Sequence, residues 1–300
     1  MKNTLLRELD EAVLREKKER AEQHAFEEAQ RLRGNLFRLA VSRAPLDGEE
    51  PCSIAASAKS TSCCRFGARN IEGLLAPRGT RLGVVICHPW GPVGGSMFDL
   101  NVVFTAYAFR ACTTLRFNFR SGMDCGITAA EDLRAACDFM LSLDDAPPER
   151  LVLLGYSYGS LVVADVAPQL DAVVAFGLLM PPLGVRALLF GLPFRRDPAE
   201  RARASTKPKL AVIGTHDQFC SPRRFDAWAQ SLNEPAEVCV LQGPQYHESC
   251  CGGAHQHVRQ RPVDHFNGFE LLEPQGFRPW VKAVFGCQLE DLDKCDGHVV

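Results

Sequence analysis

The stretch LVLLGYSYGS, residues 151–160, joins an apolar run to a serine flanked by glycines. Residues 151–154 are typical of a strand buried on both faces, and residues 158–166 have the composition of a helix. A serine on a tight strand-to-helix turn has strained backbone angles, so the positions two before and two after it must be small. The stretch therefore predicts that Ser157 is presented at the carboxyl edge of a sheet as a nucleophile.

Acyl transfer to such a serine needs N–H donors for the developing oxyanion. The Tyr158 N–H, at the start of the predicted helix, is one candidate. The other comes from CHPWGPVGGSM, residues 87–97, whose glycines allow a close backbone approach, so that the N–H of Trp90 or Gly91 faces the oxyanion. This loop has no G-K-S/T or G-x-G-x-x-G pattern, which argues against a nucleotide site.

A serine nucleophile also needs a base and an acid that orients the base, and in this chain order the acid precedes the histidine. Asp217 directly follows the apolar run 210–213 and is the best acid, although a turn or helix-capping aspartate before Pro222 would look the same. Spacing from the last predicted strand favours His247 as the base, whereas local sequence favours His265. Further histidines follow at positions 255 and 257.

Strands alternate with helices from residue 71 onward, which predicts an α/β fold with a mainly parallel, doubly wound sheet. Residues 1–45 are charged and read as a helical extension, either solvated or contacting a protein partner, and residues 46–70 read as a linker. The expected strands are residues 71–76, 82–87, 113–119, 151–154, 171–176, 210–213 and 238–241, and the expected helices are residues 129–143, 158–166, 222–232 and 277–285.

The composition of the 300 residues excludes several classes of protein. A net charge of −2 gives no basic surplus for nucleic acid. The charged beginning of the sequence lacks the apolar core of a secretory signal, and no run approaches the roughly 18 apolar residues of a membrane span. A cytoplasmic protein is expected, whose 13 cysteines are mostly reduced packing residues.

Six motifs follow one another along the chain: HPWG at 88–91, GGSM at 94–97, LRFNFR at 115–120, GYSYG at 155–159, GTHD at 214–217 and DHF at 264–266. The chain resembles the small α/β-hydrolases, in particular their dienelactone-hydrolase-like and serine-aminopeptidase-like members, over residues 71–286. The resemblance implies an α/β-hydrolase fold with little or no lid domain and a Ser–His–Asp triad, and it implies no known substrate.

The family pattern carries a D-H-F-like sequence after its final strand, so the resemblance favours His265 over His247. Residues 244–262 then look like an insertion, one that would threaten the triad if it displaced the histidine, and residues 287–300 form a tail. At residues 178–208, where larger relatives carry a lid domain, this chain has only a short segment. The apolar side chains of this segment either line an acyl pocket or complete the core; they are Leu188, Leu189, Phe190 and Phe194. Asn118 and Arg120 are also expected near the site.

The expected activity is hydrolysis of a carboxylic ester, thioester or amide in a small-molecule or acyl substrate, without a metal or organic cofactor. Ser157 attacks, His265 transfers the proton and Asp217 orients the imidazole. One alternative is a catalytically impaired binding or scaffold protein that contacts its partner through the N-terminal helix. Another is a zinc-dependent hydrolase, with ligands at His247, Cys250, Cys251 and His255.

Overall fold

The computed structural model describes residues 31–56, 70–120, 127–183, 198–243, 245–250, 255–294 and 299. The chain divides into two compact units, Met1–Ala44 and Pro45–Val300. In the first unit, residues 31–42 are helical, so the predicted helical extension is present there, while the part predicted over residues 1–30 lies outside the described residues.

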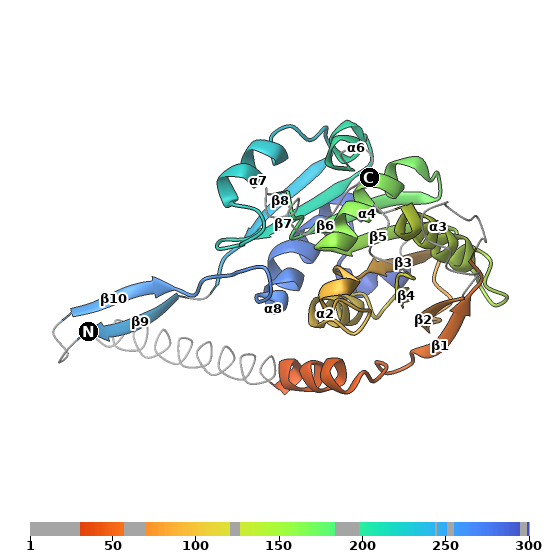
Figure 1. The fold of residues 1–300 in the computed structure, drawn as a ribbon, viewed down its shortest axis with the longest axis horizontal. Helices are drawn as coiled ribbons and strands as arrows, with labels where there is room; N and C mark the ends of the chain where they lie inside the picture. Colours follow the sequence, from red (N-terminus) through yellow and green to blue (C-terminus); the bar gives the residue numbers. More distant parts are fainter. Residues whose placement is uncertain are drawn as a thin grey trace, which may run out of the picture. The chain divides into compact units, whose positions relative to one another are not determined.

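The second unit contains an eight-stranded sheet with the order β1-β2-β4-β3-β5-β6-β7-β8 (Figure 1). β2 is antiparallel to both β1 and β4, and every other neighbouring pair is parallel. The mainly parallel sheet is thereby confirmed. The strands are β1 (Glu50–Ile54), β2 (Ile71–Ala76), β3 (Leu82–Cys87), β4 (Thr113–Phe117), β5 (Arg150–Tyr156), β6 (Val173–Leu179), β7 (Lys209–Gly214) and β8 (Ala236–Leu241).

Helices cover both faces of this sheet, because successive side chains of a strand point to opposite faces. Val85 and Cys87 of β3 belong to one apolar cluster, and Val84 and Ile86 belong to the other. α3, α4, α6 and α7 pack on the first cluster, and α2, α8 and α9 pack on the second. Their bounds are α2 (Leu100–Ala108), α3 (Ile127–Leu141), α4 (Tyr158–Val166), α6 (Pro198–Ala204), α7 (Pro222–Ala229), α8 (Phe269–Leu271) and α9 (Arg278–Phe285).

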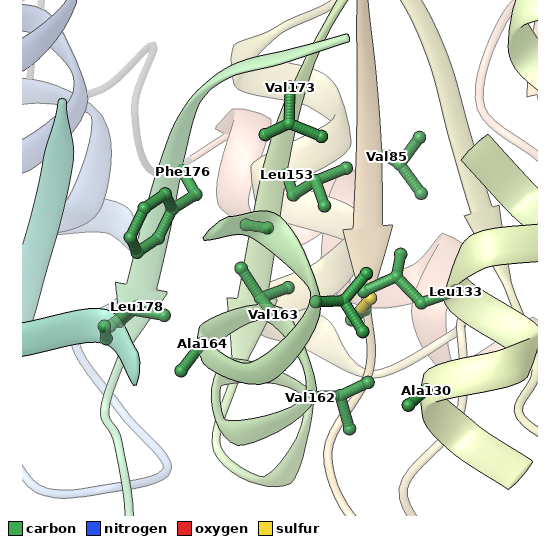
Figure 2. Packing of buried hydrophobic residues seen from close by; sticks show 14 of the residues in the cluster. Val85, Ala130, Leu133, Leu153, Val162, Val163, Ala164, Val173, Phe176 and Leu178 are labelled. Carbon is green, nitrogen blue, oxygen red and sulfur yellow. The ribbon is translucent and has the colours of Figure 1, made fainter. Parts of the chain in front are cut away.

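The helix α4 is nearly all buried and lies centrally on its face of the sheet. Figure 2 shows its Val162 and Val163 packed among side chains of β3, β5, β6 and α3. Burial of this extent fixes the start of α4 rigidly against the end of β5, and that junction contains the predicted nucleophile.

Several described elements differ from the sequence-based expectations, and three of them extend the domain or its cover. The predicted linker, 46–70, contains β1, which adds an antiparallel edge strand to β2. The predicted tail contains the 3₁₀ helix η4 (Leu289–Lys294), which buries Leu289 and Leu292. The sequence also gave no sign of α2, because its run LNVVFTAYA is rich in β-branched and aromatic residues and has no polar face.

The predicted insertion, 244–262, forms a two-stranded ribbon from β9 (Gln245–Cys250) and β10 (His255–Gln260). The strands are antiparallel and in register from Gln245 opposite Gln260 to Cys250 opposite His255. The ribbon therefore leaves the main sheet and returns to it at nearly the same place.

No helix in the described part of the chain is long and apolar enough to cross a bilayer. Several described cysteines are free thiols, and Cys87, Cys112 and Cys137 are buried in the core. Burial raises the pKa of the Cys112 and Cys137 thiols to about 12, so these side chains stay protonated packing groups. Cys287 is disulfide-bonded.

Candidate active site

Ser157 lies on the sharp turn between β5 and α4, as its sequence context predicts. Its φ of 53° and ψ of −120° are unusual for a residue with a side chain. The turn is held on both sides, because the Ser157 N–H donates to the Leu179 carbonyl at 2.8 Å and the Ser157 carbonyl accepts from the Ser160 N–H at 3.0 Å. The backbone strain, typically about 1–3 kcal/mol, is therefore borne by the packed core around α4.

The two glycines beside Ser157 are required by close backbone contacts. A Cβ at Gly155 would lie 2.3 Å from the Gly159 carbonyl oxygen. A Cβ at Gly159 would lie 2.5 Å from the Cys87 carbonyl oxygen at the end of β3. The G-x-S-x-G spacing thus lets the turn fold back on itself and lets α4 approach the neighbouring strand.

Ser157, His265 and Asp217 form one chain of hydrogen bonds. His265 Nε2 lies 2.8 Å from Ser157 Oγ, and His265 Nδ1 lies 2.7 Å from Asp217 Oδ2. Because an ionised carboxylate can only accept, Nδ1 carries the proton and Nε2 is free to accept from the serine hydroxyl. The other oxygen of Asp217 accepts from the N–H groups of Phe219 and Cys220 at 2.8 and 2.9 Å, which fixes the carboxylate.

The loop that carries His265 is anchored to the loop that carries Asp217. The His216 N–H donates to the Val263 carbonyl at 2.7 Å, and the His265 N–H donates to the Gln218 side chain at 3.1 Å. Tyr156, at the end of β5, donates its hydroxyl to the His265 carbonyl at 2.5 Å. Burial, with nearby carboxylates, raises the pKa of Tyr156 well above 10, so the hydroxyl remains a donor.

Ser157 and His265 open into a pocket of about 370 Å³. Of the predicted oxyanion residues, Trp90 and Tyr158 line this pocket, whereas Gly91 begins the 3₁₀ helix η1 (Gly91–Val93) and is not among the described lining residues. The alternative base, His247, lies in β9, and its side chain lies outside the described residues. The apolar residues expected near the site at 188–194 also lie outside them.

A comparison with families of known proteins identifies the fold. Residues 84–294 match the model of the Alpha/beta hydrolase family. The chain belongs to the alpha/beta hydrolase family. No curated protein matches this alpha/beta hydrolase closely enough to count as a relative.

Solved structures share the fold at low sequence identity. An esterase from Pyrococcus furiosus matches with a TM-score of 0.51 and 15% identity, covering 64% of this chain and 82% of its own. An alpha-beta serine hydrolase homologue from Coxiella burnetii matches with a TM-score of 0.51 and 20% identity, covering 74% and 92%. A serine hydrolase without a lid from Xanthomonas campestris matches with a TM-score of 0.50 and 21% identity, covering 65% and 84%. These similarities support the fold.

In this alpha/beta hydrolase, His88 shapes the loop that approaches Ser157. Its Nε2 accepts from the Phe119 N–H at 2.9 Å, so the proton lies on Nδ1, which donates to the Pro89 carbonyl at 2.5 Å. Burial lowers the pKa of His88 to about 4, and the bond to Pro89 opposes this only in part. A neutral His88 therefore links the pocket loop to the end of β4.

His88 should make stability depend on pH. Its pKa is about 4 in the folded protein and 6.5 when unfolded, so the unfolded chain binds the proton first as the pH falls. Wild-type protein is expected to lose roughly 2 to 3 kcal/mol more unfolding free energy between pH 7 and pH 4.5 than a His88→Gln variant. Urea unfolding of both proteins at the two pH values measures this difference, and equal losses would contradict it.

A buried ion pair holds the next part of the same loop. Arg116 of β4 donates to both carboxylate oxygens of Glu49 at 2.7 and 2.5 Å, and its third contact is the Met97 carbonyl at 2.7 Å. The Met97 N–H donates to the Asn118 side chain at 2.9 Å. Both backbone groups of Met97 are thus fixed, one by Arg116 of β4 and one by Asn118 just after it, and no sequence pattern indicates the partnership of Arg116 with Glu49.

Asn118 and Arg120, expected near the site, order loops and are not among the described residues that line the pocket. Arg120 binds both carboxylate oxygens of buried Asp132 in α3, through its backbone N–H at 2.8 Å and its Nε at 2.6 Å. The structure therefore places them in support of the loops rather than against a bound molecule.

No group of three or more His, Cys, Asp or Glu side chains suits a metal ion within the part of the chain that the structure describes. The zinc alternative drew on residues of the ribbon and its turn, whose side chains lie outside that part. The geometry is that of a serine, a histidine and an aspartate joined by hydrogen bonds next to a largely apolar pocket.

Proposed function

We propose that the protein is a serine hydrolase that cleaves a carboxylic ester, thioester or amide through an acyl-enzyme. The observation that carries the proposal is the continuous hydrogen-bonded chain from Ser157 Oγ to His265, at 2.8 Å, and on to Asp217, at 2.7 Å. Membership of the alpha/beta hydrolase family, together with esterases among the proteins of similar fold, supports it.

In the first half of the reaction, Ser157 Oγ attacks the substrate carbonyl carbon while His265 Nε2 takes the hydroxyl proton. Asp217 stabilises the imidazolium that results and keeps its ring oriented. The backbone N–H groups of Tyr158 and Trp90 are the proposed donors to the oxyanion. Collapse of the tetrahedral intermediate breaks the bond to the leaving group, which receives the proton from His265.

In the second half, water attacks the acyl-enzyme with His265 as the base, which releases the acid and restores Ser157. The rings of Phe219 and Tyr156, with centroids 4.4 and 5.5 Å from that of His265, pack around the imidazole. They restrict the movement of the imidazole, so that the ring keeps its orientation between Ser157 and Asp217.

A fluorophosphonate probe tests the proposal, because it reacts with an activated serine and with few other side chains. Wild-type protein is expected to be labelled at one residue, and Ser157→Ala is expected to lose at least 99% of the label, since the nucleophile is removed. Ser231→Ala, which removes an exposed serine of the same domain, is the matched control and should label like wild type.

Absence of labelling in folded wild-type protein would contradict the proposal and favour the scaffold alternative. That alternative requires the inserted ribbon to have displaced the histidine. The 2.8 Å contact between His265 and Ser157 argues against such a displacement.

A further inference from the structure

The pocket beside Ser157 has an uneven distribution of charge. Its walls are largely apolar and aromatic, with contributions from Trp90, Tyr156, Phe219 and Phe266. Among the described residues that line it, Asp99 has the one carboxylate, and none is a lysine or arginine. Asp99 takes no part in the hydrogen-bonded chain of Ser157, His265 and Asp217.

Asp99 also caps α2, but capping does not account for a carboxylate at this position. Its Oδ1 accepts from the Asn101 N–H at 2.9 Å. Asparagine caps helices about as well as aspartate, and it would do so without a buried charge. Burial raises the pKa of Asp99 to about 6, although the hydrogen bonds from Asn101 and the nearby His265 oppose the increase, so ionisation here has a cost.

The charged and titratable groups around Asp99 come from three elements. The Asp99 pKa responds to charge on His265, which follows β10, and both Asp99 and Asp217, which follows β7, raise the pKa of Tyr156. Asp217 is engaged by His265 and by two backbone N–H groups. The carboxylate of Asp99, which accepts hydrogen bonds from Asn101 and Val102, is therefore the negative charge in the pocket wall that lies outside the Ser157–His265–Asp217 chain.

We propose that this pocket selects substrates carrying an ammonium group, with Asp99 as the residue that determines the specificity. A carboxylate beside aromatic rings attracts a cation by its charge and by the electron-rich ring faces, and it repels an anion. The proposal rests on the proposed hydrolase function for turnover, but the binding preference belongs to the pocket itself. Asp99 acts on the charged part of the substrate and not on the reacting carbonyl.

The test compares acetylcholine with 3,3-dimethylbutyl acetate, which has the same shape and no charge, at pH 8. In wild-type protein, kcat/KM is expected to be about tenfold higher for the cationic ester, in line with a desolvated cation near rings and a carboxylate. In Asp99→Asn, which retains the cap of α2, the ratio is expected to fall close to one. Thermal unfolding checks that the variant is folded.

A second measurement does not need turnover. Calorimetry with Ser157→Ala protein compares choline with 3,3-dimethylbutan-1-ol, and Ser157→Ala/Asp99→Asn is the matched control. Preference for choline that requires Asp99 supports the inference even if no ester is hydrolysed, in which case the proposed function alone fails. Equal binding of the two alcohols, or an ester ratio that is the same in wild type and Asp99→Asn, overturns the inference. If the neutral ester is nevertheless hydrolysed, the proposed function stands.

Discussion

Replacing His265 with glutamine is expected to lower kcat for a reactive ester by about 10⁴-fold or more. The imidazole lies within hydrogen-bond distance of both Ser157 Oγ and Asp217 Oδ2, so no other described side chain is placed to take the serine proton. Glutamine retains polarity and approximate size but cannot carry a proton between the serine and the leaving group. Steady-state kinetics with a p-nitrophenyl ester measures the loss.

His247→Gln is the control, because His247 is the other histidine that the sequence offers as the base. His247 lies in β9, a strand of the ribbon. The activity of the His247→Gln variant is expected to stay within about twofold of wild type, as for a substitution outside the reacting groups. A large loss with His247→Gln and a small loss with His265→Gln would reverse the assignment of the base.

Glu49→Gln is expected to reduce the free energy of unfolding by about 3 to 5 kcal/mol. Glu49 and Arg116 form a fully buried pair, with side-chain exposures of 2% and 0%. The substitution leaves the charge of Arg116 without its counter-ion in the interior, and such a loss is a large part of the stability of a typical domain. Urea unfolding at pH 7 measures the change.

Glu149→Gln provides the matched comparison at the surface. Glu149 pairs with Arg81 at 2.7 Å, but their side chains are 55% and 52% exposed, so water and salt screen the interaction. Its loss is expected to cost less than about 1 kcal/mol. Similar effects of the two substitutions would show that the buried pair contributes no more than a surface pair.

The turn that carries Ser157 was predictable from sequence because its determinants are local. An apolar run, two glycines and a serine occupy consecutive positions, and the close contacts at Gly155 and Gly159 explain why that spacing is needed. Asp217 could be predicted nearly as well, since it directly follows the predicted strand that corresponds to β7. The fold class followed from the alternation of strands and helices.

The remaining features depend on contacts between residues far apart in the chain. The choice between His247 and His265 could not be made from the residues alone, because it depends on where the chain returns after the ribbon. The pairing of Glu49 with Arg116 joins residues 67 positions apart and leaves no local pattern. Asp99 likewise belongs to none of the six sequence motifs, and only the fold places it in the pocket wall.

The β9–β10 ribbon has a consequence for how this chain tolerates change. Its first and last residues are paired, and a Cβ at Gly243 would lie 2.2 Å from the Arg261 carbonyl oxygen, so the backbone before the ribbon touches the backbone after it. Length can therefore be gained or lost between β9 and β10 while His265 stays in position. A reporter or an affinity tag can therefore be inserted between β9 and β10, and natural sequences can differ in length there, without a change in the rest of the domain.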